Sequence, residues 1–354
     1  GLELERIEEG DDIKPAFEPP PGLDLRPYQK DAIRAWSKEG GRGILAMATG
    51  AGKTITALVL AAKVAERNRP LLLLVVCPFI HLCRQWISEI AGFGATAVAC
   101  FEGRQRWESR LDDAYQRRSA GLDPLQVVVT TNATFLSDAF QSRLLPRVNA
   151  GNIHHLLIAD EVHNLGSTRA QKALPEGIRL RLGLSATPER HLDPVGTSAV
   201  LDYFGGIIFE YGIAEAIAEG RLCRYRYHPL LVELTDDEAD QYLEITNRLA
   251  RFMHGDGPDQ ELNQTAMHLL MRRARLVGAA ANKLQVLDQL ISRLDQPPSQ
   301  AIFYCGDGRT TDQLGQEEVR QIQAVAKLLS DKHGLRVRNF NLSREHERAR
   351  RDPA

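Results

Sequence analysis

The sequence predicts an α/β fold, with helices covering both faces of a doubly wound parallel sheet. Between residues 44 and 209, short apolar runs alternate with stretches of helical periodicity. Strands buried on both faces are continuously apolar, and helical crossovers let them run parallel. A ligand of such a sheet binds where the strands end. The expected strands are 44–47, 71–77, 97–101, 126–130, 154–159, 180–184 and 206–209.

The first expected strand runs through a glycine-containing loop into an apolar helix. The segment 47–54 reads Met-Ala-Thr-Gly-Ala-Gly-Lys-Thr. Glycines let backbone N–H groups approach an anion, and a helix N-terminus favours negative charge. Lys53 would reach the β- and γ-phosphate oxygens, and the Thr54 hydroxyl would bind Mg²⁺. Met47 stands where the usual pattern has glycine, so a turn with an incidental lysine is the alternative. The predicted phosphate-binding residues are Thr49, Gly50, Ala51, Gly52, Lys53 and Thr54.

A second apolar strand, 154–159, delivers two adjacent carboxylates at its end. Asp160 and Glu161 follow it directly. Neighbouring side chains at a strand end point in different directions, so the two can have different tasks. Asp160 would hold Mg²⁺, and Glu161 would orient and deprotonate an attacking water. An isolated Asp-Glu pair is usually a solvated strand end. After a phosphate loop, it indicates the second half of an NTPase site.

The order of four motifs indicates a family. The segment 25–29 reads Leu-Arg-Pro-Tyr-Gln, 160–163 reads Asp-Glu-Val-His, and 185–188 reads Ser-Ala-Thr-Pro. With the phosphate loop between the first and second of these, residues 23 to 342 resemble the superfamily 2 helicases and translocases. The loop and the Asp-Glu-Val-His box look most similar to XPB-like helicases and to the motor subunits of restriction enzymes. The resemblance implies a RecA-like ATP-binding domain, followed by a second, incomplete RecA-like domain.

The resemblance also implies roles for individual residues. Gln29 would read the adenine edge, in a pocket shaped by Arg26 and Tyr28. His163 would connect the nucleotide site to the nucleic-acid surface through Ser185, Ala186 and Thr187. The expected nucleic-acid contacts follow strands, and for these a purely structural role is an open alternative. They are Pro78, Phe79, Thr130, Thr131 and Gly306.

Composition shifts divide the chain into four segments. Residues 1–22 are acidic and then proline-rich, as in a leader or linker, and 23–220 form the ATP-binding domain. Residues 221–228 are a connector with three arginines. Residues 229–354 are the partial second domain, with a helical segment at 236–294. Further expected elements are helices at 213–219, 236–253, 264–294, 319–333 and 343–351, a turn at 254–259, and strands at 229–234, 300–305 and 335–340.

Charge and composition exclude several classes of protein. The net charge of −2 argues against a protein that merely coats nucleic acid, but a local groove can still bind a phosphate backbone. The five cysteines lack the close spacing of a zinc site or a disulfide framework. No apolar run is long enough for a membrane span, and the first residues do not resemble a signal peptide. A cytoplasmic location is the default expectation.

Three functions remain open at this point. The leading hypothesis is an ATP-dependent DNA helicase or translocase that uses ATP and Mg²⁺, with RNA as the less favoured substrate. The second is the motor of a restriction or antiviral defence complex, with a nuclease supplied by a partner. The third is an ATP-gated nucleic-acid-binding module with little turnover. Residues 310–354 contain no match to the family's arginine-finger motif, so we expect a fragment that binds ATP·Mg²⁺ and hydrolyses it poorly.

Overall fold

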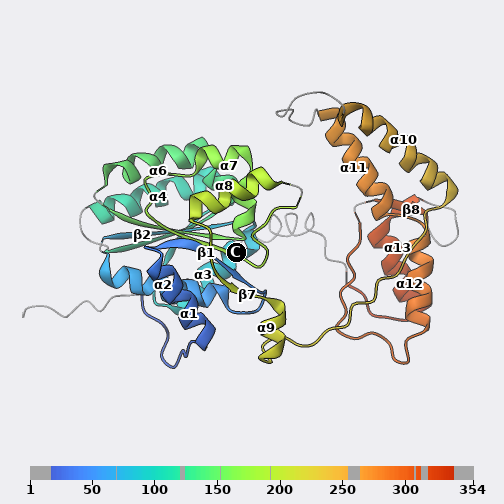
Figure 1. Cartoon of the computed structure of the whole chain (residues 1–354), viewed down its shortest axis with the longest axis horizontal. Helices are drawn as coiled ribbons and strands as arrows, with labels where there is room; N and C mark the ends of the chain where they lie inside the picture. Colours follow the sequence, from blue (N-terminus) through green and yellow to red (C-terminus); the bar gives the residue numbers. More distant parts are fainter. Residues whose placement is uncertain are drawn as a thin grey trace, which may run out of the picture. The chain divides into compact units, whose positions relative to one another are not determined.

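In the computed structural model, the chain divides into two units, Gly1–Tyr225 and Arg226–Ala354 (Figure 1). The boundary lies within the segment expected to be a connector. The structure describes residues 17–68, 70–119, 124–151, 153–191, 193–253, 264–306, 308–311 and 318–338.

A seven-stranded sheet forms the centre of the first unit. Its strand order is β3-β4-β2-β5-β6-β1-β7, and all neighbouring strands are parallel. Every strand expected between residues 44 and 211 is present, with small shifts at the ends, so the α/β prediction is confirmed. The strands are β1 (Arg42–Met47), β2 (Leu71–Cys77), β3 (Ala97–Cys100), β4 (Leu125–Thr131), β5 (His154–Asp160), β6 (Leu180–Ser185) and β7 (Ile207–Tyr211).

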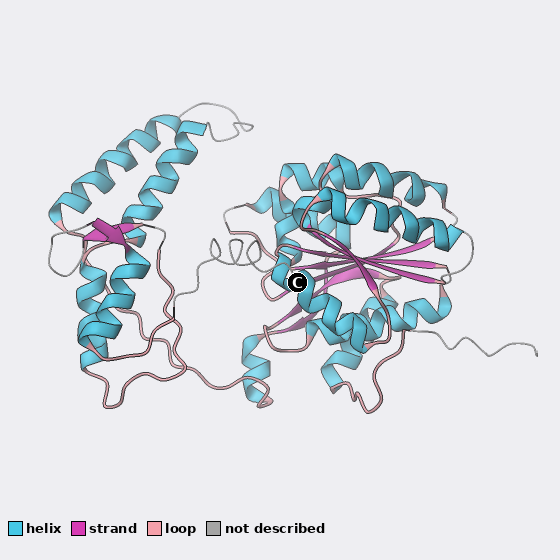
Figure 2. Cartoon of the chain, turned by 180° about the vertical axis from the view of Figure 1, so that it is seen from behind, coloured by secondary structure: helices cyan, strands magenta, loops and turns pink. Residues whose placement is uncertain are grey.

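Helices cover both faces of this sheet (Figure 2). Alternate residues of β2 enter different cores: Leu71 and Leu73 pack in one cluster, and Leu72 and Leu74 in the other. The first face is covered by α1 (Pro27–Lys38), α2 (Lys53–Arg67), α3 (Ile80–Gly92) and α9 (Ile213–Ala218). The second face is covered by α4 (Arg104–Ser119), α5 (Asn132–Phe135), α6 (Asp138–Ala150), η1 (Val162–Gly166), α7 (Thr168–Ala173) and α8 (Pro194–Phe204).

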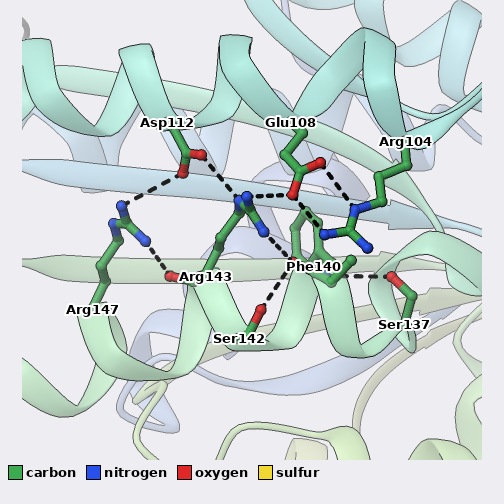
Figure 3. Close-up of polar contacts among 9 residues, drawn as sticks. Arg104, Glu108, Asp112, Ser137, Phe140, Ser142, Arg143 and Arg147 are labelled. Atoms are coloured by element: carbon green, nitrogen blue, oxygen red, sulfur yellow. Dashed lines mark hydrogen bonds and ion pairs between the residues drawn. The ribbon is translucent and has the colours of Figure 1, made fainter.

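An ion-pair ladder joins α4 to α6 on the second face (Figure 3). Arg143 of α6 reaches both Glu108 and Asp112 of α4, and its Nε lies 3.1 Å from an Asp112 oxygen. Arg104 makes two 2.9 Å bonds to Glu108 and is the main cause that lowers the pKa of this carboxyl. Arg147 extends the ladder at 3.9 Å from Asp112. Ion pairs that remain partly in contact with solvent contribute little energy singly, so the ladder mainly fixes how the two helices align.

Packing in the first unit begins upstream of residue 23. Phe17 is buried, and its ring centroid lies 5.7 Å from that of Phe93. The Glu18 N–H donates to the Phe93 carbonyl at 3.0 Å. The end of the segment expected to be a leader is therefore part of this core. Among the described residues, no helix is long and apolar enough to cross a membrane.

Two helix pairs make up most of the described part of the second unit. The helices α10 (Asp236–Met253) and α11 (Gln264–Gly278) share a small core of Ile245, Leu249, Ala266 and Leu269. A second core joins α12 (Asn282–Ser292) to α13 (Gln321–Lys327) and the π-helix η2 (Leu328–Lys332). The short strands β8 (Arg309–Thr311) and β9 (Glu318–Arg320) pair antiparallel. The helices expected at 236–253 and 319–333 are thus found, and that expected at 264–294 is broken after Gly278 into α11 and α12.

The strands expected in this unit were predicted wrongly. Residues 229–234, 300–305 and 335–338 form neither strand nor helix. Ile302 and Tyr304 are 77% and 93% exposed. An apolar run becomes a strand only beside a partner that satisfies its backbone groups, and the described residues of this unit supply none here. The expected turn at 254–259 and helix at 343–351 lie outside the described residues, as do residues 339–340. The assignment of this unit as a partial RecA-like domain stays a prediction.

Candidate nucleotide site

The predicted motifs meet at one edge of the sheet. The strands β5, β6 and β1 are neighbours and parallel, so their carboxyl ends lie at the same edge. Ala46 of β1 is paired with Ser185 of β6, and Asp160 of β5 is paired with Leu184 of β6. The sheet therefore brings the phosphate loop, the acidic pair and the Ser-Ala-Thr motif together, although they are far apart in the sequence.

The phosphate loop connects β1 to α2 through left-handed backbone. Gly50 and Gly52 have φ of +82° and +81°. A Cβ at Gly52 would lie 2.6 Å from the Gln29 amide nitrogen that donates to the Gly52 carbonyl, so a side chain here would displace Gln29 in addition to straining the backbone. The 15-residue helix α2 begins at Lys53 and points its positive end at the loop. The predicted loop therefore has the conformation that an anion site needs.

Lys53 lies within the electrostatic reach of both carboxylates. Its ammonium donates to the Met47 carbonyl at 3.0 Å and lies 3.5 Å from that of Ala48. Burial lowers the pKa of Lys53, whereas the carboxylates of Glu161 and Asp160 act to raise it. An ammonium held near buried carbonyls and two carboxylates has lost much of its water. A bound phosphate would replace that lost solvation.

Two N–H groups hold the Asp160 carboxylate. The Trp86 indole of α3 donates to Oδ2 at 2.9 Å, and the Glu161 N–H donates to Oδ1 at 3.0 Å. Trp86 is almost fully buried, and the sequence did not indicate its bond to Asp160. Each carboxylate oxygen keeps a further lone pair for a ligand. Asp160 is therefore fixed in orientation and still able to bind a cation.

Glu161 is held in strained backbone. Its φ and ψ are +46° and +53°, the left-handed region that costs a residue with a side chain about 1–2 kcal/mol. The strain occurs where β5 ends and η1 begins. Strain of this kind is typical of functional positions, where the surrounding structure enforces it.

His163 lies between the acidic pair and the Ser-Ala-Thr motif. Its Nδ1 is 3.0 Å from the Ser185 Oγ and 3.6 Å from a Glu161 oxygen. The Thr187 N–H donates to the same Ser185 oxygen at 3.1 Å, while Ala186 between them is half-buried. Three of the four residues predicted to couple the sites, His163, Ser185 and Thr187, thus lie within one hydrogen-bonded chain.

Arg190 ties this chain to the start of α8 and was not foreseen. One of its N–H groups donates to the His163 carbonyl, and its Nε donates to Asp193 at 2.7 Å. Asp193 caps α8 through the Gly196 N–H at 2.8 Å. A Cβ on Gly166 or Gly196 would lie 2.4 Å or 2.8 Å from the Arg190 side chain. These contacts join η1, β6 and α8, and the order of residues alone gave no signal for them.

The residues predicted for the adenine pocket brace the phosphate loop. The Tyr28 hydroxyl donates to the Ala51 carbonyl at 3.0 Å, and Arg26 donates to that hydroxyl at 2.9 Å. The Gln29 amide accepts from the Arg26 N–H at 2.9 Å and donates to the Gly52 carbonyl at 3.3 Å. Its second N–H and second lone pair could still read a base.

The far side of this pocket comes from β7. The Tyr211 ring is stacked on Tyr28, with centroids 3.9 Å apart and planes at 9°. The Tyr211 hydroxyl donates to Glu219 at 2.9 Å. Burial, reinforced by Glu219, raises the pKa of Tyr211 to about 12. The sequence did not indicate Tyr211, because it lies far beyond the last recognised motif.

The expected nucleic-acid contacts have different environments. Phe79 is 57% exposed next to Pro78, where β2 ends, and its ring is stacked on His81. Thr131 caps α5 by accepting from the Thr134 N–H at 3.3 Å. Thr130 is fully buried and donates to the Cys100 carbonyl at 2.9 Å, so its predicted contact with a phosphate is corrected to a structural role. Gly306 lies in the second unit, where its N–H donates to the Gln321 amide oxygen.

Comparisons with known proteins agree with the motifs. Residues 22–190 match the family model described as "Type III restriction enzyme, res subunit". The chain is 31% identical over 238 residues to the "DNA 3'-5' translocase XPB2" of Sulfurisphaera tokodaii, covering 66% of this chain and 46% of that protein. It is 26% identical to a "Putative DNA 3'-5' helicase Rad25" of Halobacterium salinarum, covering 68% and 36%. The chain thus spans less than half the length of either relative.

Among solved structures, the chain resembles a nuclease-deletion mutant of the Type ISP restriction-modification enzyme LlaGI in complex with a DNA substrate mimic. The identity is 16%, the TM-score is 0.45, and the match covers 93% of this chain and 31% of that one. The helicase domain of Pyrococcus furiosus Hef gives a TM-score of 0.42 at 17% identity, with coverage of 72% and 58%. Motif order, the matched family model and the XPB2 relative lead to one conclusion. These findings support a superfamily 2 helicase in the first unit, similar to the XPB-like helicases and to the restriction-enzyme motor subunits.

Proposed function

We propose that this chain is the ATP-hydrolysing part of a motor that moves along DNA, as a helicase or translocase. The observation that carries the proposal is the meeting of Lys53 with Asp160 and Glu161 at one sheet edge, close enough for their charges to act on one another. A cation from a helix N-terminus facing two carboxylates from a strand end suits phosphoryl transfer from a nucleotide to water.

Each residue of this group has a distinct task in the proposed reaction. The N–H groups of the loop and the positive end of α2 bind the phosphates, and Lys53 neutralises the β- and γ-oxygens. Glu161 directly follows the carboxyl end of β5, where it can accept a proton from the attacking water. Gln29 and the stacked pair of Tyr28 and Tyr211 position the base beside the loop.

The oxygen donors here fit Mg²⁺. Mg²⁺ is held in such sites by one or two protein oxygens together with phosphates and water. Thr54, in the first turn of α2, and Asp160, with a spare lone pair on each oxygen, would hold it. The described residues contain no cluster of three or more His, Cys, Asp or Glu that could bind a metal without the nucleotide. When bound, Mg²⁺ would neutralise charge that develops on the phosphates.

Hydrolysis would be transmitted through His163. The bond between His163 and Ser185 joins the acidic pair to β6, and Arg190 continues the link to α8. A shift of Glu161 upon loss of the γ-phosphate would therefore displace a packed chain of polar contacts rather than one side chain. When packed elements have two alternative arrangements, a small local change of this kind is converted into movement of larger elements.

The proposal is tested by measuring steady-state ATP hydrolysis with and without single- and double-stranded DNA. Lys53→Ala should abolish DNA-stimulated turnover. Lys63→Ala is the matched control, because Lys63 is an exposed lysine on the same helix. Glu161→Gln should retain ATP binding and lose turnover. Equal turnover in the two lysine variants would refute the site. ATP binding without turnover under any condition would agree with the missing arginine-finger motif, and it would leave the ATP-gated binding module open until a longer chain is tested.

The family description favours one refinement of the proposal. Residues 22–190 match a restriction-enzyme subunit, so we propose a nuclease or defence-complex subunit as a partner for the motor. The test is incubation of this chain with plasmid DNA, ATP and Mg²⁺. We expect intact plasmid. Lys53-dependent cutting would place the nuclease in this chain and refute the need for a partner.

A further inference from the structure

A short segment after α9 combines positive charge with exposed aromatic rings. Residues 221–228 read Arg-Leu-Cys-Arg-Tyr-Arg-Tyr-His and form neither helix nor strand. We call this segment the Arg/Tyr strip. Its three arginines are exposed, and Tyr225 and Tyr227 are 67% and 82% exposed. The nearest acidic residues in the sequence are Glu219 and Glu233, so the strip has a concentrated positive charge in a chain whose net charge is −2.

In the part of the chain that the structure describes, the arginines of the strip form no ion pair, although the charge of Arg221 acts to lower the pKa of Tyr211. Across the described ranges, Arg221, Arg224 and Arg226 have no carboxylate within ion-pair distance, unlike the ladder arginines of α4 and α6. The two tyrosines likewise have no ring partner in the described part of the chain. Such large apolar rings are usually covered in a folded protein. Both kinds of side chain are therefore available to an external ligand.

The start of the strip is fixed beside the phosphate loop. The N–H groups of Arg221 and Leu222 both donate to the Ala216 carbonyl of α9, at 2.7 Å and 3.0 Å. The Leu222 side chain lies 3.3 Å from the position that a Cβ would take on Gly50. Because the remaining residues follow directly along the chain, the strip begins at the nucleotide site.

We infer that the Arg/Tyr strip binds single-stranded nucleic acid. Cations alternating with aromatic rings match the two features that a single strand offers, phosphates at its edge and unpaired bases with open faces. The arginines bind phosphates, and the tyrosines stack on bases. A duplex offers the same phosphates but keeps its bases stacked on one another. The binding energy of the strip for a duplex would therefore contain the contribution of the charges but not that of stacking. The inference rests on the proposed motor function for its biological setting, but the binding itself is tested independently.

The test is fluorescence anisotropy of a labelled oligothymidine, titrated with the full chain at several salt concentrations. Each phosphate contact to a single strand contributes about 0.7 to the slope of log K against log salt. Changing Arg221, Arg224 and Arg226 together to Gln should reduce this slope by about 2. Changing Tyr225 and Tyr227 to Leu should weaken binding about tenfold or more with an unchanged slope, because stacking is lost and charge is not. The corresponding Phe variants should bind as the wild type does.

A control with the same change in net charge distinguishes binding at a local site from non-specific electrostatic attraction between the protein and the oligonucleotide. Arg34, Arg110 and Arg293 are exposed arginines elsewhere in the fold, and changing all three to Gln should leave affinity within about twofold. An equal loss in the strip and control variants would overturn the inference, as would wild-type affinity in the Tyr→Leu variant. ATP binding is measured in parallel. Lys53-independent ATP binding would refute the proposed function, whereas intact ATP binding with an unaffected strip variant would refute only this inference.

Discussion

The bond from Trp86 to Asp160 gives the sharpest test of the site. Trp86→Phe removes the indole N–H that holds the Asp160 Oδ2 at 2.9 Å and keeps an aromatic ring in the core. A hydrogen bond to a charged group contributes about 1.5–3 kcal/mol. If this energy orients the carboxylate for Mg²⁺, its loss should raise the Mg²⁺ concentration for half-maximal ATP binding about 10- to 100-fold. Excess Mg²⁺ should restore binding.

Trp36 provides a matched control. It is also buried, and its indole N–H also donates over 2.9 Å, but to the main-chain carbonyl of Arg181 at the other end of β6. Trp36→Phe therefore makes the same chemical change away from the acidic pair. Both variants should lose about 2–4 kcal/mol of unfolding free energy, from the cavity and the lost bond. Only Trp86→Phe should shift the Mg²⁺ requirement.

The assay is a Mg²⁺ titration of fluorescent ATP-analogue binding, with urea unfolding of each variant measured alongside. Equal Mg²⁺ requirements for the two variants would refute the reasoning. So would a loss of binding in Trp86→Phe that excess Mg²⁺ does not restore, because it would show general damage to the loop rather than a misplaced carboxylate.

Three other predictions concern the loop and its coupling. Gly52→Ala should weaken ATP binding about tenfold or more in calorimetric titration, because its methyl group would displace the Gln29 amide, whose nitrogen would lie 2.6 Å away. Gly22→Ala, at φ +82° in open space, should lose only about 1–2 kcal/mol of unfolding free energy. Arg190→Lys should lower DNA-stimulated kcat about tenfold and leave the KM for ATP within about twofold, because it removes the bond to the His163 carbonyl but no nucleotide contact. ATP affinity should fall as pH rises through the lowered pKa of Lys53, which lies below 10.5.

The sign of the pH prediction follows from proton binding. Between the folded pKa of Lys53 and 10.5, the unfolded chain binds more protons than the folded chain, so this lysine's contribution to stability increases with pH there while phosphate binding is lost. An ATP affinity that does not change with pH up to pH 10.5 would contradict the prediction.

Equal ATP affinity of the two glycine variants would contradict the steric argument. In Arg190→Lys, a raised KM for ATP without a fall in kcat would mean that Arg190 acts on nucleotide binding and not on coupling.

The sequence alone was sufficient for the sheet of the first unit and for the phosphate loop. Parallel strands covered on both faces are continuous apolar runs, so 71–77 and 154–159 could be recognised without knowing their neighbours. The loop is equally local, because its glycines, Lys53 and the start of α2 are consecutive residues. The same reasoning failed at 229–234 and 300–305, where an apolar run has no neighbouring strand among the described residues to pair with.

Only the tertiary structure could decide which groups support these motifs. Trp86 and Asp160 are 74 residues apart, Arg190 and His163 are 27 apart, and Tyr211 reaches Tyr28 from the opposite end of the unit. A motif records a local chain conformation that its own residues specify. A hydrogen bond between distant elements depends on strand order and register instead, and these are fixed only when the whole sheet packs. The sequence therefore indicated the candidate site residues, and the fold determined how they are held.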